Sequence, residues 1–242
     1  MSILDSITIL YETDDILVIN KPAGLSVHPD GRTKEITLVD WVMNTHPEMK
    51  NVGEPITLTS GAVIDRPGIV HRIDRETSGV LLLTKNQKAF NYFKTQFKDR
   101  LIHKEYHAFV YGIPPKEFGT INRPIGRSRT DFRMWSAQSR ARGEMRDAVT
   151  YYEVMKVGTE ASLIKVIPKT GRTHQIRVHF KAIHHPVVSD TLYAPNKPKL
   201  FGFTRVALHA QSLEFIDLKG KKVIIEAPYP ADFQKAVTEI SL

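Results

Sequence analysis

The chain has 242 residues, enough for a sizeable buried core in one large domain or two small ones. Hydrophobic residues make up 41% and charged residues 25%, which is ordinary globular usage and excludes disorder, collagen and coiled coil for the chain as a whole. The net charge of +8 favours a polyanionic partner, and the lack of cysteine excludes disulfides, thiolate zinc sites and a cysteine nucleophile.

No internal repeat or low-complexity tract divides the chain, so we expect one domain over residues 1–242. The N-terminus lacks the basic region and small-residue cleavage site of a signal peptide. The longest apolar run, around Val80–Leu83, is too short to cross a bilayer. These features predict a soluble cytoplasmic protein without a membrane segment.

Strands are predicted where β-branched and aromatic residues cluster in short runs. Several runs alternate apolar and polar residues or lie a hairpin apart, which favours antiparallel pairing for much of the sheet. In chain order the predicted strands are Ile7–Tyr11, Ile16–Asn20, Val80–Thr84, Glu105–Tyr111, Ala148–Val157, Ala161–Ile167, Ser212–Ile216 and Val223–Glu226.

Three segments have the apolar spacing of amphipathic helices. The first two are Ile36–Asn44 and Asn86–Asp99. The third opens after Gly171 with Thr173 as its N-cap and ends at His185-Pro186. Helices placed irregularly among paired strands predict an α+β fold.

Two segments, Glu48–Gly68 and Phe118–Arg146, are predicted to be loops from their glycine, proline and charged residues. Residues 123–146 hold seven arginines, no lysine and two acids, a net charge of +5. Arginine suits phosphate oxygens and can stack on bases. A solvated charged loop is the alternative interpretation.

The segment His71–Gly79 is the strongest candidate for chemistry. Asp74 lies between Arg72 and Arg75, and nearby cations favour the ionised carboxylate that a nucleophile or general base needs. Thr77 belongs to what we expect to be a tight turn before the strand at Val80. A purely structural, ion-paired turn is the alternative.

The same segment resembles the catalytic motif of the RluA-type pseudouridine synthases, although Ile73 stands where leucine is usual. Further blocks match the family in kind and order over about residues 7–230, and several ordered motifs are more specific than one. These blocks are Val18–Gly24 with Val27–Pro29, Lys104–Ala108, Gly171–His179, Arg205–Ala210 and Ala227–Pro230.

The resemblance implies a pseudouridine synthase fold: a central mixed, largely antiparallel sheet flanked by helices and loops, with an active-site cleft across it. The implied domain is a single catalytic domain over residues 1–242, without the N-terminal S4 domain that many members carry. The implied activity is isomerisation of specific uridines in ribosomal RNA, transfer RNA or both to pseudouridine, on a flipped nucleotide and without cofactor or metal. We expect a monomer.

Site residues follow from the resemblance. Asp74 matches the catalytic carboxylate, Arg177 the basic residue that pairs with it, and Tyr106 the active-site tyrosine. Alternatively, Tyr106 is a core residue of its strand and Arg177 a surface arginine. Arg72 matches the residue that fills the gap left by the flipped uridine, and Leu208 would line the uracil pocket. The remaining expected RNA contacts are His71, Thr77, Arg127, Arg129 and Arg133.

Two other functions are compatible with parts of the sequence. A non-catalytic RNA-binding protein or folding helper would keep the basic surface and leave uridines unchanged. A phosphodiester hydrolase would need a second carboxylate or a metal cluster. His174 and His179 are five residues apart, which does not place them on one helical face, so we expect no metal site.

Overall fold

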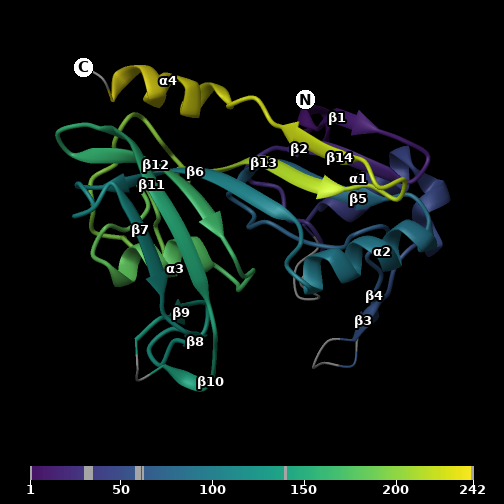
Figure 1. Cartoon of the computed structure of the whole chain (residues 1–242), viewed down its shortest axis with the longest axis horizontal. Helices are drawn as coiled ribbons and strands as arrows, with labels where there is room; N and C mark the ends of the chain where they lie inside the picture. Colours follow the sequence, from purple (N-terminus) through teal and green to yellow (C-terminus); the bar gives the residue numbers. More distant parts are fainter. Residues whose placement is uncertain (1, 30–34, 58–60, 62, 139–140, 241–242) are drawn as a thin grey trace. The chain divides into compact units, whose positions relative to one another are not determined.

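The computed structural model describes residues 2–29, 35–57, 61, 63–138 and 141–240 (Figure 1). It divides into two compact units, which we describe separately. Unit 1 comprises Met1–Ile102 and Ser212–Pro228, and unit 2 comprises His103–Gln211 and Tyr229–Leu242. The single domain expected over residues 1–242 stays a prediction.

Unit 1 is built on antiparallel strands. Strand β2 (Ile16–Lys21) pairs with β1 (Thr8–Glu12) on one side and with β5 (Ser78–Thr84) on the other. The segment of β13 (Leu208–Ile216) that lies in this unit pairs with β14 (Lys222–Glu226). Every residue of β5 is buried, which agrees with its unbroken apolar run.

Unit 1 also contains helices. Its α-helices are α1 (Leu38–Thr45) and α2 (Gln87–Lys98), and Asn86 caps α2 by accepting a 2.9 Å hydrogen bond from the backbone N–H of Ala89. Phe93 of α2 packs in one buried apolar cluster with residues of β2, β5 and β13. The smaller elements are the 3₁₀ helices η1 (Ile3–Ser6) and η2 (Pro47–Asn51) and the hairpin of β3 (Ile56–Thr57) with β4 (Val63–Ile64).

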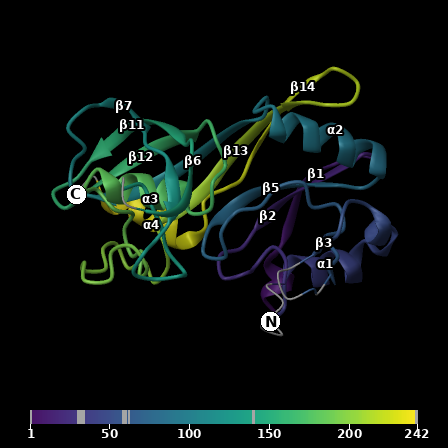
Figure 2. The same ribbon diagram turned by 90° about the horizontal axis from the view of Figure 1, so that it is seen from below.

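Within unit 2, antiparallel strands pair in the order β6 (His103–Tyr111), β12 (Ala161–Pro168), β11 (Val149–Val157) and β7 (Phe118–Asn122). Helix α3 (Gln175–Ala182) lies beside β11 and β12 in both views (Figure 2). Helix α4 (Ala231–Glu239) adds Phe233 to the buried cluster around Phe109. A small sheet of β10 (Arg142–Arg146), β8 (Ile125–Arg127) and β9 (Trp135–Ser136) completes the unit.

The predicted α+β class is confirmed, and each predicted strand is present with ends shifted by four residues at most. The prediction of a loop over Phe118–Arg146 is wrong, because β7 to β10 lie within it. Glu48–Gly68 likewise holds β3, β4 and part of η2. These strands are two to five residues long and too rich in charged or small residues to carry a clear β pattern.

The helix predictions also need corrections. The N-cap of α3 is His174, in a left-handed conformation with φ 54°, and not Thr173. The sequence analysis does not predict helix α4, because its described buried residues, Phe233 and Ala236, make too short an apolar pattern. Within the described residues, none of the helices has the length and apolarity needed to cross a membrane.

Candidate active site

The loop that carries Asp74 runs directly into buried strand β5. Asp74 is half-buried, and its carbonyl oxygen accepts a 3.1 Å hydrogen bond from the N–H of Thr77, which closes the predicted turn. The Thr77 side chain is buried, and its hydroxyl has no hydrogen-bond partner among the described residues. The turn therefore fixes the backbone of Asp74 immediately before the rigid strand.

A buried lysine ties this loop to the first sequence block. Lys21 is fully buried, and its Nζ donates to the carbonyl oxygens of Pro22, Leu25 and Arg75 at 2.7, 2.8 and 3.1 Å. Gly24, which has φ 88°, donates its N–H to the same Arg75 carbonyl at 2.8 Å, and Arg75 Nε donates back to Gly24 O at 3.0 Å. Two blocks far apart in the sequence therefore form one structure beside Asp74.

Arg72 has a defined partner even though its side chain is exposed. Its Nη1 lies 2.9 Å from Nε2 of His28, and Nδ1 of His28 lies 3.0 Å from the carbonyl oxygen of Pro29. Since an arginine only donates, Nε2 accepts and Nδ1 carries the proton. Burial lowers the pKa of His28, which favours this neutral ring.

His71 is held by contacts inside unit 1. Its Nε2 accepts a 2.9 Å hydrogen bond from the N–H of Leu82, and its ring stacks on that of Phe97 with centroids 4.3 Å apart. Both contacts help to fix the start of the Asp74 loop against β5 and α2.

In unit 2, Tyr106 lies on β6, half-buried and packed against the main apolar cluster. Because side chains alternate along a strand, its neighbours Glu105 and His107 face the other way. His107 contacts Tyr229 through Nδ1 and Glu105 through Nε2, the latter at 3.1 Å. Burial and the charge of Glu105 raise the pKa of Tyr229 to about 12.

Arg177 is buried in helix α3, so the alternative of a surface arginine is wrong. It forms a bidentate ion pair with the fully buried Asp190, with Nε donating to Oδ2 at 2.7 Å and Nη2 donating to Oδ1 at 2.9 Å. Asp190 also accepts the backbone N–H of Leu192 at 3.1 Å and of Tyr193 at 3.0 Å. The Tyr193 ring lies 5.0 Å from the guanidinium. The sequence analysis missed Asp190.

Leu208 opens β13 and is buried in the apolar cluster of unit 2. Arg205 braces this position, since its Nη1 donates to the Leu208 carbonyl at 3.2 Å while its Nε donates to Asp232 of α4 at 2.7 Å. Asp74 lies in unit 1, whereas Tyr106, Arg177 and Leu208 lie in unit 2. Their action on one uridine stays a prediction.

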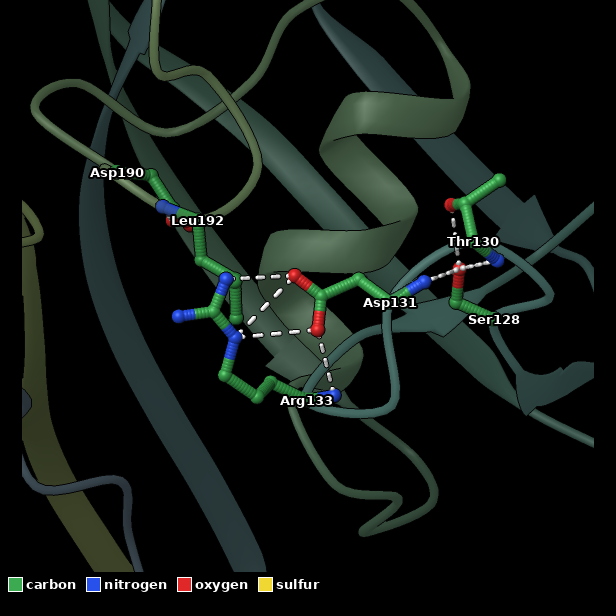
Figure 3. A network of polar contacts seen from close by, with 6 residues as sticks. All are labelled: Ser128, Thr130, Asp131, Arg133, Asp190 and Leu192. Carbon is green, nitrogen blue, oxygen red and sulfur yellow. Dashed lines mark hydrogen bonds and ion pairs between the residues drawn. The ribbon is translucent and has the colours of Figure 1, made fainter.

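The three predicted RNA-binding arginines have different surroundings, although all are exposed. The guanidinium of Arg127 lies over the Trp135 ring, 4.2 Å from its centroid. Arg133 forms an ion pair with Asp131 at 2.7 Å (Figure 3). In the described part of the chain, His, Asp and Glu residues form no group of three or more that could hold a metal ion.

Comparison with known proteins identifies the class. A family model described as RNA pseudouridylate synthase matches residues 15–182. The human protein "RNA Pseudouridylate Synthase Domain Containing 1" superposes with a TM-score of 0.73 at 26% identity, covering 94% of this chain and 85% of that one. This likeness confirms the predicted pseudouridine synthase fold.

Bacterial relatives agree with this class. An uncharacterized RNA pseudouridine synthase of Mycobacterium tuberculosis is 39% identical over 239 residues, which are 97% of this chain and 73% of the relative. The "Ribosomal large subunit pseudouridine synthase D" of Zymomonas mobilis is 36% identical, covering 93% of this chain and 70% of the relative. The chain belongs to the RNA pseudouridylate synthase family, which confirms the predicted enzyme, an isomerase that acts on RNA.

Proposed function

We propose that this enzyme converts uridines of ribosomal RNA to pseudouridine with Asp74 as its catalytic carboxylate. The main support for this role is the set of contacts that holds the Asp74 loop, which we call the clamp. In the clamp, the buried Lys21 side chain and the N–H of Gly24 both donate to the Arg75 carbonyl oxygen. A catalytic group has to be held in place by rigid neighbours, and this loop has them.

In the reaction the bond between C1′ and N1 of uridine breaks, and a bond between C1′ and C5 forms. C5 loses its proton and N1 gains one, so the atoms balance without a cofactor. The ionised Asp74 would start the cleavage. We assign Tyr106 to the face of the uracil ring, Leu208 to the apolar wall of its pocket, and Arg72 to the stack vacated by the flipped nucleotide.

Arg177 would orient the Asp74 carboxylate. Its pair with Asp190 uses Nε and Nη2 and fixes the plane of the guanidinium, which a lone flexible arginine could not maintain. We therefore propose Arg177 as a positioning group whose orientation is set by Asp190.

The names of two relatives support ribosomal RNA as substrate. The proteins of Zymomonas mobilis and Xanthomonas campestris, 36% and 35% identical to this chain, are both named "Ribosomal large subunit pseudouridine synthase D". The net charge of +8 suits any RNA, so transfer RNA is the alternative substrate. We also propose that the enzyme works as a monomer in the cytoplasm.

The test of this substrate is tritium release from RNA labelled at uracil C5. Large-subunit ribosomal RNA transcripts and bulk transfer RNA are treated in parallel with the full chain. Release from the ribosomal transcripts alone is the expected result. Release from transfer RNA alone would overturn the ribosomal assignment, and release from neither would contradict the proposed activity on these RNAs.

A further inference from the structure

The most exposed large hydrophobic side chain among the described residues is that of Phe132, at 74%. It lies in the turn between β8 and β9 of unit 2. An aromatic ring this exposed to water either binds a partner or is one of the single exposed apolar residues that are common on protein surfaces. The contacts around Phe132 favour a binding role.

The turn is held by a dense set of polar contacts (Figure 3). Ser128 Oγ accepts from the N–H groups of Thr130 and Asp131 at 3.3 and 3.4 Å. The Asp131 carboxylate accepts from the N–H of Arg133 at 2.8 Å and from its Nη2 at 2.7 Å. Phe132 therefore lies between two residues that are hydrogen-bonded to each other, which restricts its backbone conformation.

Arg127 supports the turn from the neighbouring strand. Its Nη1 donates to the carbonyl oxygen of Phe132 at 3.2 Å, and its guanidinium lies over the Trp135 ring. The N–H of Trp135 donates to the Tyr193 hydroxyl at 2.9 Å, so the base of the turn is anchored beside α3. Phe132 is therefore exposed on a turn that several contacts hold in place.

The surroundings of Phe132 are cationic. Arg129 and Arg133 flank it in the sequence, and residues 123–146 carry a net charge of +5. Such a charge attracts RNA phosphates, while unpaired bases stack on exposed aromatic rings next to them. An apolar protein partner would not require this charge, so RNA is the occupant that the turn fits best.

We propose that Phe132 is a stacking platform for an unpaired base of the RNA substrate, with Arg129 contacting a neighbouring phosphate. This proposal rests on the proposed function, since it needs an RNA substrate. It also gives separate tasks to the predicted arginines: Arg127 and Arg133 shape the turn through their contacts with Phe132 and Asp131.

The test uses the full chain and the RNA from which it releases most tritium. Phe132→Ala is expected to weaken RNA binding about 10-fold, the size of one lost base stack. Phe132→Trp is expected to restore it. Phe118→Ala is the matched control, because Phe118 is 61% exposed on β7 of the same unit and is expected to leave affinity unchanged.

Salt dependence separates stacking from charge. Phe132→Ala is expected to keep the slope of log affinity against log salt, whereas Arg129→Ala should reduce it by about one. Unchanged affinity in Phe132→Ala, or an equal loss in Phe118→Ala, would overturn the stacking role. Failure of the wild type to release tritium would instead contradict the proposed function, so the two failures are distinct.

Discussion

Nζ of Lys21 lies 3.1 Å from the carbonyl oxygen of Arg75, the residue that follows Asp74. The side chain of Lys21 is fully buried and also binds two carbonyl oxygens of its own block, those of Pro22 and Leu25. A buried ammonium group needs such partners, and here they belong to the segment after β2 and to the loop that carries the proposed catalytic carboxylate. Lys21 therefore links the backbone of Asp74 to strand β2.

Replacing Lys21 by methionine keeps most of the length of the side chain but removes the ammonium group, which leaves these carbonyl groups without that donor. Each unsatisfied buried group costs about 1–3 kcal/mol, so we expect a lower free energy of unfolding and a lower kcat. Urea denaturation and tritium release measure the two effects. Lys88→Met, at an exposed position of α2, is the control. Wild-type stability and kcat in Lys21→Met would show that the clamp is dispensable.

The pair of Arg177 and Asp190 is nearly excluded from water in unit 2. Removing one partner of a buried pair leaves the other charge uncompensated, which costs about 3–5 kcal/mol. We expect a loss of this order in Asp190→Asn by urea denaturation. Glu239→Gln removes an exposed pair with Lys235 and should cost less than about 0.5 kcal/mol. Equal losses in both variants would be incompatible with a buried pair.

The contact between Arg72 and His28 predicts a pH effect. Burial holds the pKa of His28 below its ordinary value of 6.5. The stabilisation from the neutral His28 ring is therefore complete above pH 6.5 and is lost as the pH falls through the lower pKa of the folded state. The loss occurs because Nε2 gains a proton and can no longer accept a hydrogen bond from Arg72. Proton NMR should show the His28 ring titrating below pH 6.5. Titration above this value would refute the prediction.

Tyr229 predicts a loss of stability at high pH. Its pKa of about 12 exceeds the ordinary value of 10.0, so the folded state keeps the phenol proton longer than the unfolded chain does. The stabilisation is complete below pH 10 and is lost between about pH 10 and 12. Ultraviolet titration of tyrosinate should lack this late transition in Tyr229→Phe. The same late transition in the variant would assign it to another tyrosine.

The longer strands of the two units could be predicted because each carries its own local pattern, as the run Val80–Leu83 does in β5. The strands β8 and β10 could not, because they contain arginine and glycine in place of a run of β-branched or aromatic residues. Strand β9 has only two residues, too few for a pattern.

The motifs predict Asp74 and Arg177 as site residues but do not predict the contacts that hold them. Lys21 ends a strand, where a lysine is expected to reach water, and its burial depends on a carbonyl 54 residues away. Asp190 follows α3 in a segment without a motif, and only the fold brings its carboxylate to Arg177. Long-range partners of this kind are set by tertiary structure and leave no local pattern in one sequence.

We propose that Asp74 starts the isomerisation. The most direct measurement is tritium release by Asp74→Asn from C5-labelled RNA, with RNA affinity and unfolding measured on the same protein. The control is Asp14→Asn, which changes an exposed carboxylate of the same unit. We expect no release by Asp74→Asn at wild-type affinity and stability, and full release by Asp14→Asn. Release by Asp74→Asn at the wild-type rate would contradict it.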